Sequence, residues 1–113
     1  MFDRLPLVMH EGGTMPVYSV WESHFPPDKF EEGRQITVAI WRDMTEFDGY
    51  ISHELIEDLD DAGHLLVVSQ WTTRERADAV LHEYAGHANA RRVNELVSRP
   101  RARFVGHGVA SAA

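Results

Sequence analysis

The stretch Phe47–Trp71 constrains the fold most, because it predicts two neighbouring strands joined by an acidic turn. In the first strand, Tyr50–Glu57, apolar and polar residues alternate, which is typical of a half-exposed strand. The second, His64–Trp71, is apolar on both faces at positions 65–68. A strand buried on both faces lies centrally in a sheet, so each side of it must be covered.

Alternation assigns the side chains of the first strand to two faces. Ile51, His53 and Leu55 share one face, and Tyr50 lies on the other. Short acidic residues and Gly63 then provide the turn, because carboxylates bond the local backbone and glycine tolerates positive φ.

The rest of the chain supplies one strand, a long helix, two short helices and a last strand. These are expected at Met15–Phe25, at Asp28–Phe47, from Thr72 or Thr73 through Tyr84, at Ala88–Ser98 and at Arg101–Val109. The order matches the split βαββαβ pattern of ferredoxin-like α+β folds. That pattern predicts a four-stranded antiparallel sheet with the first and third strands in the centre.

The segment Asp28–Phe47 fits two structures. Gln35–Trp41 is rich in β-formers with alternating apolar residues. A helical stripe with spacings of three and four competes with that interpretation: it comprises Phe30, Gly33, Thr37, Ile40, Met44 and Phe47. Gly33 costs a helix about 1 kcal/mol relative to alanine. The acidic start after two prolines favours a helix, which we predict.

The chain divides into an N-terminal arm at 1–14, one α+β domain at 15–109 and a C-terminal tail at 110–113 that should fray. Helices cover one face of the predicted sheet, and no segment remains for the other. We therefore predict a homodimer formed through sheet faces.

Composition restricts the partners. The net charge of -7 over 113 residues argues against nucleic acid, because binding a polyanion requires a basic surface. The chain has no cysteine, which excludes disulfides and thiolate metal sites. Its first residues lack a signal-peptide pattern, and no apolar run reaches the length of a membrane span. The cytoplasm is the expected location, with no membrane partner.

Histidine spacing predicts no metal site. His82 and His87 are one residue further apart than in the H-E-x-x-H motif, and Gly86 interrupts their helix. The other histidines, including His24 and His64, show no ligand spacing. We expect no metal and no other cofactor.

The predicted hairpin and the residues after it resemble a known family. Phe-Asp-Gly-Tyr-Ile opens the second strand with a glycine, and Leu-Leu-Val-Val-Ser-Gln-Trp ends the third with a tryptophan. With these motifs, residues 15–109 resemble the antibiotic biosynthesis monooxygenase-like family, whose members pair as dimeric α+β barrels. The family includes cofactor-independent oxygenases of quinone precursors, quinol oxidases and haem-degrading enzymes.

The resemblance implies a cleft between sheet and helices. The cleft tryptophan of the oxygenase type matches Trp71, and an arginine of that type falls at or near Arg91. If the family register holds, alternation places five side chains along the cleft: His53, Leu55, Val67, Ser69 and Trp71. His53 would then remove a phenolic proton, Trp71 would stack on the substrate ring, and Arg91 would stabilise the oxyanion.

These expectations predict a cofactor-independent monooxygenase that acts on a small aromatic phenol or quinol in an apolar cleft. The alternative is a dimeric barrel that binds a small hydrophobic ligand, or serves a stress or regulatory role, without turnover. Leu55 and Val67 occupy positions that are polar in the oxygenase type, which favours the alternative. The haem-degrading type's tryptophan and ligand histidine fall on Val80 and Ala90, so haem binding fits less well.

Overall fold

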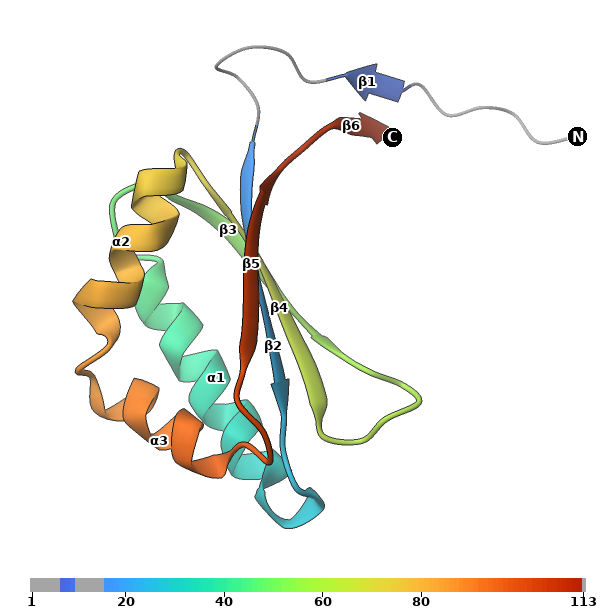
Figure 1. Ribbon diagram of the computed structural model, residues 1–113, viewed down its shortest axis with the longest axis vertical. Coiled ribbons are helices and arrows are strands. Elements are labelled where there is room, and N and C mark those ends of the chain that lie inside the picture. Colours follow the sequence, from blue (N-terminus) through green and yellow to red (C-terminus); the bar gives the residue numbers. More distant parts are fainter. Residues whose placement is uncertain (1–6, 10–15, 113) are drawn as a thin grey trace, which may run out of the picture.

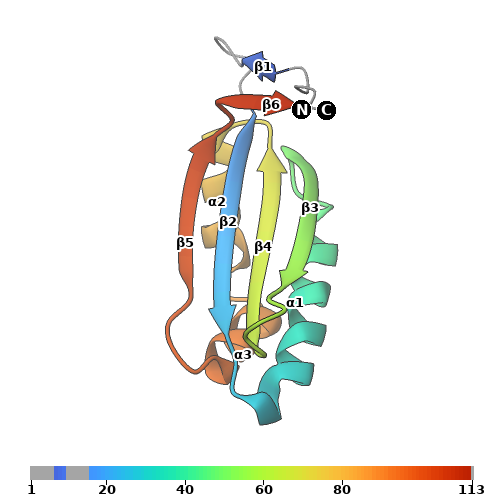
Figure 2. The same cartoon turned by 90° about the vertical axis from the view of Figure 1, so that its right-hand side faces the viewer.

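The computed structural model describes residues 7–9 and 16–112. Its main sheet has four antiparallel strands: β2 (Val17–His24), β3 (Tyr50–Glu57), β4 (His64–Trp71) and β5 (Ala102–His107). The spatial order is β3-β4-β2-β5, so β2 and β4 are central (Figure 2). This is the ferredoxin-like α+β fold that the sequence predicted.

The helices all lie on one face of the sheet (Figure 1). They are α1 (Phe30–Met44), preceded by a 3-10 turn at Pro27–Lys29, α2 (Arg74–Tyr84) and α3 (Ala88–Leu96). Thr73 caps α2 by accepting a hydrogen bond of 3.1 Å from the Arg76 amide. None of the described helices is both long and apolar enough to cross a bilayer.

The ambiguous segment is helical, as predicted. The buried side of α1 consists of Gly33, Thr37, Ile40, Trp41 and Met44. Gly33 is required by close packing, because a Cβ there would lie 2.4 Å from the Phe25 ring. The glycine that weakens the helix locally therefore allows it to approach the end of β2.

Strand β4 is central as predicted, but within one chain only one of its faces is fully covered. Leu65, Val67, Ser69 and Trp71 face the helices and are each at most 3% exposed. The alternate residues, such as Leu66 and Val68, are only partly buried. The face without helices therefore remains open, which is the arrangement from which the sequence predicted dimerisation.

The predicted faces of β3 are wrong at its first residues. Tyr50 pairs with Trp71 and Ser52 pairs with Gln70, so Ile51 is an extra residue in a β-bulge. The bulge breaks the alternation and brings Tyr50 to the same face as His53, where its hydroxyl lies 2.6 Å from the His53 Nδ1. Ile51 instead is exposed.

The two ends of the chain also differ from expectation. Strand β1 (Leu7–Met9), within the predicted arm, pairs antiparallel with β6 (Ala110–Ala112), within the tail that was expected to fray. The other arm residues lie outside the described residues. Because alanine and serine have low strand propensity, local sequence gives no signal for this pairing.

Candidate functional site

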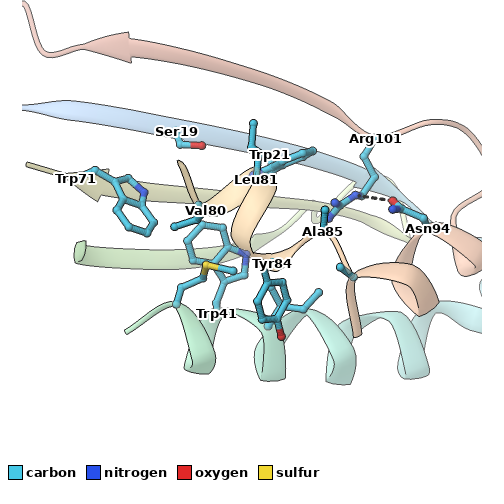
Figure 3. A pocket seen from close by; sticks show the side chains of 13 residues that line it. Ser19, Trp21, Trp41, Trp71, Val80, Leu81, Tyr84, Ala85, Asn94 and Arg101 are labelled. Atoms are coloured by element: carbon cyan, nitrogen blue, oxygen red, sulfur yellow. Dashed lines mark hydrogen bonds between the residues drawn. The ribbon is translucent and has the colours of Figure 1, made fainter. Parts of the chain in front are cut away.

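A cavity of about 200 Å³ lies between the sheet and the helices (Figure 3). Its walls come from β2, β4, all three helices and the residue before β5. They are lined by Ser19, Trp21, Ile40, Trp41, Met44, Trp71, Val80, Leu81, Tyr84, Ala85, Ala90, Asn94 and Arg101. Most of these side chains are apolar or aromatic, so the cavity suits an apolar ring with few polar groups.

All three tryptophans of the chain border this cavity. Trp71 is fully buried, and its indole Nε1 donates a hydrogen bond of 2.9 Å to the Ser69 hydroxyl. Ser69 in turn donates to the Ser19 carbonyl at 3.2 Å. Ser69 therefore fixes the Trp71 ring, and a rigid aromatic wall results.

Tyr84 presents its ring to the cavity and its hydroxyl to α1 (Figure 3). The hydroxyl donates a hydrogen bond of 2.6 Å to the Asp43 carboxylate. Burial and the neighbouring Asp43 charge together raise the pKa of Tyr84 to about 12. The phenol is therefore protonated at neutral pH, which excludes it as a proton acceptor there.

Arg101 and Asn94 form the polar end of the cavity, opposite Trp71 (Figure 3). The Arg101 Nε donates to the Asn94 Oδ1 at 3.1 Å, and the guanidinium carbon lies 4.3 Å from the centre of the Trp21 ring. Burial lowers the pKa of the Arg101 guanidinium, although the group stays charged at any physiological pH.

Arg103, two residues further on, lies on the same side of the sheet but is fully engaged. Its guanidinium donates to the Asp78 carboxylate and to the Ala77 carbonyl at 3.1 Å each, and to the Ser19 hydroxyl at 3.3 Å. Arg103 thus ties β5 to α2 and β2.

Comparison with protein families supports the resemblance. The profile described as "Antibiotic biosynthesis monooxygenase" matches residues 16–91, which is most of the chain. The chain belongs to this family.

Solved structures agree with the family fold. The chain is similar to Rv0793 from Mycobacterium tuberculosis, with 25% identity, a TM-score of 0.69, and 87% of this chain and 99% of that chain covered. It also resembles SO0527 from Shewanella oneidensis, with 15% identity, a TM-score of 0.68, and 94% of this chain and 100% of that chain covered. A third similar structure is a conserved protein from Methanosarcina mazei Go1, with 11% identity, a TM-score of 0.70, and 83% of this chain and 93% of that chain covered. Comparison with curated proteins finds no match.

Of the monooxygenase-family site residues predicted from sequence, only Trp71 lines the cavity. Leu55 and Val67 pair across β3 and β4 on the helix side, but they pack in the core next to the cavity. Ser69 acts behind Trp71, as described above. Arg91 is exposed on α3 and donates to the Gly86 carbonyl at 2.9 Å, so it cannot reach a ligand in the cavity.

His53 also lies outside the cavity. Its ring centre is 5.6 Å from that of Trp41 and 5.7 Å from that of Tyr50. Tyr50 in turn packs edge-on against Trp71, with ring centres 5.8 Å apart. His53 therefore supports the aromatic wall from behind. Burial lowers the pKa of His53, which favours the neutral imidazole.

The sequence interpretation missed Trp21, Trp41, Tyr84 and Arg101 as lining residues. Trp41 follows the buried Thr37 by four positions, so the helical stripe contained a signal for it. Tyr84 was predicted as the last residue of its helix, without a role. Arg101 directly follows Pro100 in an irregular turn, where no periodicity predicts the direction of a side chain.

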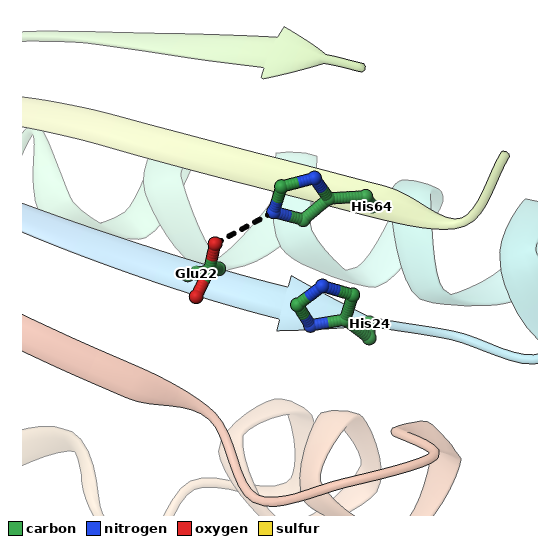
Figure 4. Close-up of side chains that lie close together, drawn as sticks. All are labelled: Glu22, His24 and His64. Atoms are coloured by element: carbon green, nitrogen blue, oxygen red, sulfur yellow. Dashed lines mark hydrogen bonds and ion pairs between the residues drawn. The ribbon is translucent and has the colours of Figure 1, made fainter. Parts of the chain in front are cut away.

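On the opposite face of the sheet, β2 and β4 bring together three potential metal ligands that sequence spacing did not reveal (Figure 4). The ligand atoms of Glu22, His24 and His64 lie within 4.8 Å of one another. The His64 Nε2 is 2.7 Å from Glu22, and its Nδ1 is 2.8 Å from Asp58. A protonated imidazole satisfies both carboxylates without a metal. Of the described histidines, His82 and His87 join no such group.

Proposed function

We propose that this protein is a cofactor-independent monooxygenase, and that its substrate is a phenol or hydroquinone bound in the cavity between sheet and helices. The observation that carries the proposal is the wall of three tryptophans and Tyr84 around about 200 Å³. An apolar cavity of about 150 Å³ accepts benzene. The size therefore suits a single substituted ring better than three fused rings.

The reaction needs no electron donor besides the substrate. A hydroquinone and O₂ give a hydroxyquinone and water: one oxygen atom enters the ring, and the other leaves as water with two hydrogens. The four electrons that reduce O₂ all come from the hydroquinone. The protein would hold the ring, exclude bulk water and favour the electron-rich phenolate that reacts with O₂.

The second candidate is ligand binding without turnover, and one observation favours it. Among the described residues that line the cavity, Tyr84 and Arg101 are the titratable side chains, and neither accepts a proton at neutral pH. An enzyme of this type would depend on a substrate that ionises readily.

Oxygen consumption distinguishes the two candidates. We expect single-ring hydroquinones to be oxidised with one O₂ consumed per hydroxyquinone formed, without added flavin or metal. Dialysis against a chelator should leave the rate unchanged. Binding of these compounds with no oxygen uptake above that of buffer would establish the second candidate.

We further propose that the protein is a homodimer whose subunits pack through the open sheet face. Supporting this, Phe104 is 63% exposed on that face beside the partly buried Val20 and Leu66. A patch of this kind is unusual on a monomer. Light scattering at micromolar concentration should give twice 12.9 kDa. A stable monomer would contradict the proposal.

A further inference from the structure

The polar end of the cavity carries more information about the ligand than its apolar walls do. Resting on the proposed function, we propose that Arg101 is a specificity-determining residue and that the ligand is an aromatic ring with an anionic oxygen group, a carboxylate or a phenolate. The family resemblance implies this anion-stabilising role for Arg91, but Arg91 is exposed and does not line the cavity.

Arg101 is a partly buried charge that has no counter-ion in the part of the chain that the structure describes. Among the residues that the structure describes, no carboxylate forms an ion pair with it, and its only hydrogen bond runs from Nε to Asn94. By contrast, two neighbouring arginines have acidic partners: Arg92 pairs with Glu32, and Arg103 pairs with Asp78. Removing a cation from water without a partner is unfavourable, and binding sites are where such a cost persists.

The polar end of the cavity is also rich in hydrogen-bond donors. The two terminal nitrogens of Arg101 are donors only. The Asn94 oxygen already accepts from Arg101, so its amide nitrogen offers donors as well. This end of the cavity therefore presents more donors than acceptors. A ligand group that only accepts hydrogen bonds matches it, and a carboxylate fits the guanidinium fork with two parallel bonds.

Arg101 also lies at the boundary between the cavity and a more open surface. Trp21, Asn94 and Arg101 line both the cavity and an adjoining open groove that continues along Val97–Arg101. The guanidinium also lies over the Trp21 ring at 4.3 Å, which holds it in place. A ring in the cavity would thus direct its charged group toward this boundary, where water reaches it.

The test compares ligands that differ only in charge. Calorimetry would measure binding of benzoate and of benzamide, its neutral counterpart of similar shape, to the full-length protein. Hydrogen bonds to charged groups correspond to about a 10- to 100-fold change in affinity, and we expect benzoate to bind more tightly by that factor. Equal affinity would overturn the inference, and this comparison needs no variant.

Variants then assign the effect to Arg101. Arg101→Gln should reduce benzoate binding about 10- to 100-fold and benzamide binding by clearly less, because a neutral amide loses only a hydrogen bond, while Arg101→Lys should recover part of the benzoate loss. Arg91→Gln is the matched control, since Arg91 is exposed and lines neither the cavity nor the groove. Equal losses in the two glutamine variants would overturn the assignment, because long-range charge would then explain the effect.

A nitrophenol whose anion absorbs visible light distinguishes the two anions. If phenolate is held, binding should lower the apparent pKa of the nitrophenol in wild type and not in Arg101→Gln. Charge-selective benzoate binding without this shift assigns the site to carboxylates. Charge-selective binding without oxygen uptake would support the role of Arg101 while contradicting the proposed oxygenase. Failure of one proposal can therefore be distinguished from failure of the other.

Discussion

The two faces of the sheet are built from the same strands but differ in how they are covered. On the helix side, β2 presents Ser19 and Trp21 to a closed aromatic cavity. On the other side, the same strand presents Val20 and Glu22 to an open surface. The helix side is complete within one chain, whereas the open side leaves large apolar groups such as Phe104 in solvent.

This difference separates ligand binding from assembly. The cavity lies between the sheet and the helices of the same chain, on the face away from the proposed dimer contact. The open face gains its cover only from a second molecule under our proposal. Substitutions on the two faces should consequently have different readouts, and the following experiments test that separation.

The largest expected effect is on the helix side. Trp71→Ala removes a fully buried ring and should lower the free energy of unfolding by about 3–5 kcal/mol, measured by urea denaturation. Trp21→Ala is the control, because Trp21 is only partly buried at the cavity mouth. It should cost less stability. An equal loss in both variants would show that the aromatic wall is not anchored at Trp71.

The next effect concerns the open face. Phe104→Glu should raise the dimer dissociation constant about 100-fold or more, because an unpaired charge would be buried in the proposed interface. Val109→Glu is matched to it, since both residues are 63% exposed but Val109 lies beyond β5. Sedimentation across a concentration series measures both. Ligand affinity should be unchanged in either variant. Loss of ligand affinity in Phe104→Glu would contradict the idea that ligand binding and assembly depend on different faces.

A smaller effect should appear with pH on the open face. Hydrogen bonds to Asp58 and Glu22 raise the pKa of His64, and the bond from His64 lowers the pKa of Asp58. The His64 contribution to stability is thus complete below about pH 6.5 and is lost as pH rises through its raised value. The Asp58 contribution is present above about pH 4 and is lost as pH falls through its lowered value.

The measurement is the melting temperature of wild type and His64→Gln between pH 3 and pH 9. The melting temperatures of the two proteins should differ most between about pH 4 and 6.5, and this difference should become smaller below and above that range. His82→Gln, an exposed histidine of α2, is the control and should follow wild type. A difference between wild type and His64→Gln that does not vary with pH would exclude the charged network.

The smallest effect is expected at His53. Because it stands behind Tyr50 and Trp41, His53→Ala should reduce kcat less than tenfold. Loss of a general base would reduce kcat about 100-fold or more. Rates with a hydroquinone, measured after a check of folding, decide between these values. A 100-fold loss would restore the catalytic role that the sequence suggested.

The fold was largely predictable because its signals are periodic. Strands β3 and β4 begin and end at the predicted residues, since alternation and a glycine turn are local features. The bulge at Ile51 was not predictable, because it depends on which residue of β4 lies opposite. The pairing of β1 with β6 also depends on distant partners rather than on local propensity.

The site was less predictable than the fold. Family resemblance identified Trp71, whose place at the end of a strand is set by topology. It also suggested Arg91, whereas the arginine that reaches the cavity is Arg101, ten positions later in a turn. Side chains in turns follow the detailed backbone path, which neither periodicity nor a loose motif specifies.

The alternation along β2 has an evolutionary consequence. Ser19 and Trp21 can change without touching the open face, and Val20 and Glu22 can change without touching the cavity. Substitutions at the odd-numbered positions of β2 would alter ligand preference, whereas substitutions at the even-numbered positions would alter the mode of assembly. Under the two proposals, alternating positions of β2 would thus specify ligand binding and assembly, and each property could change independently of the other.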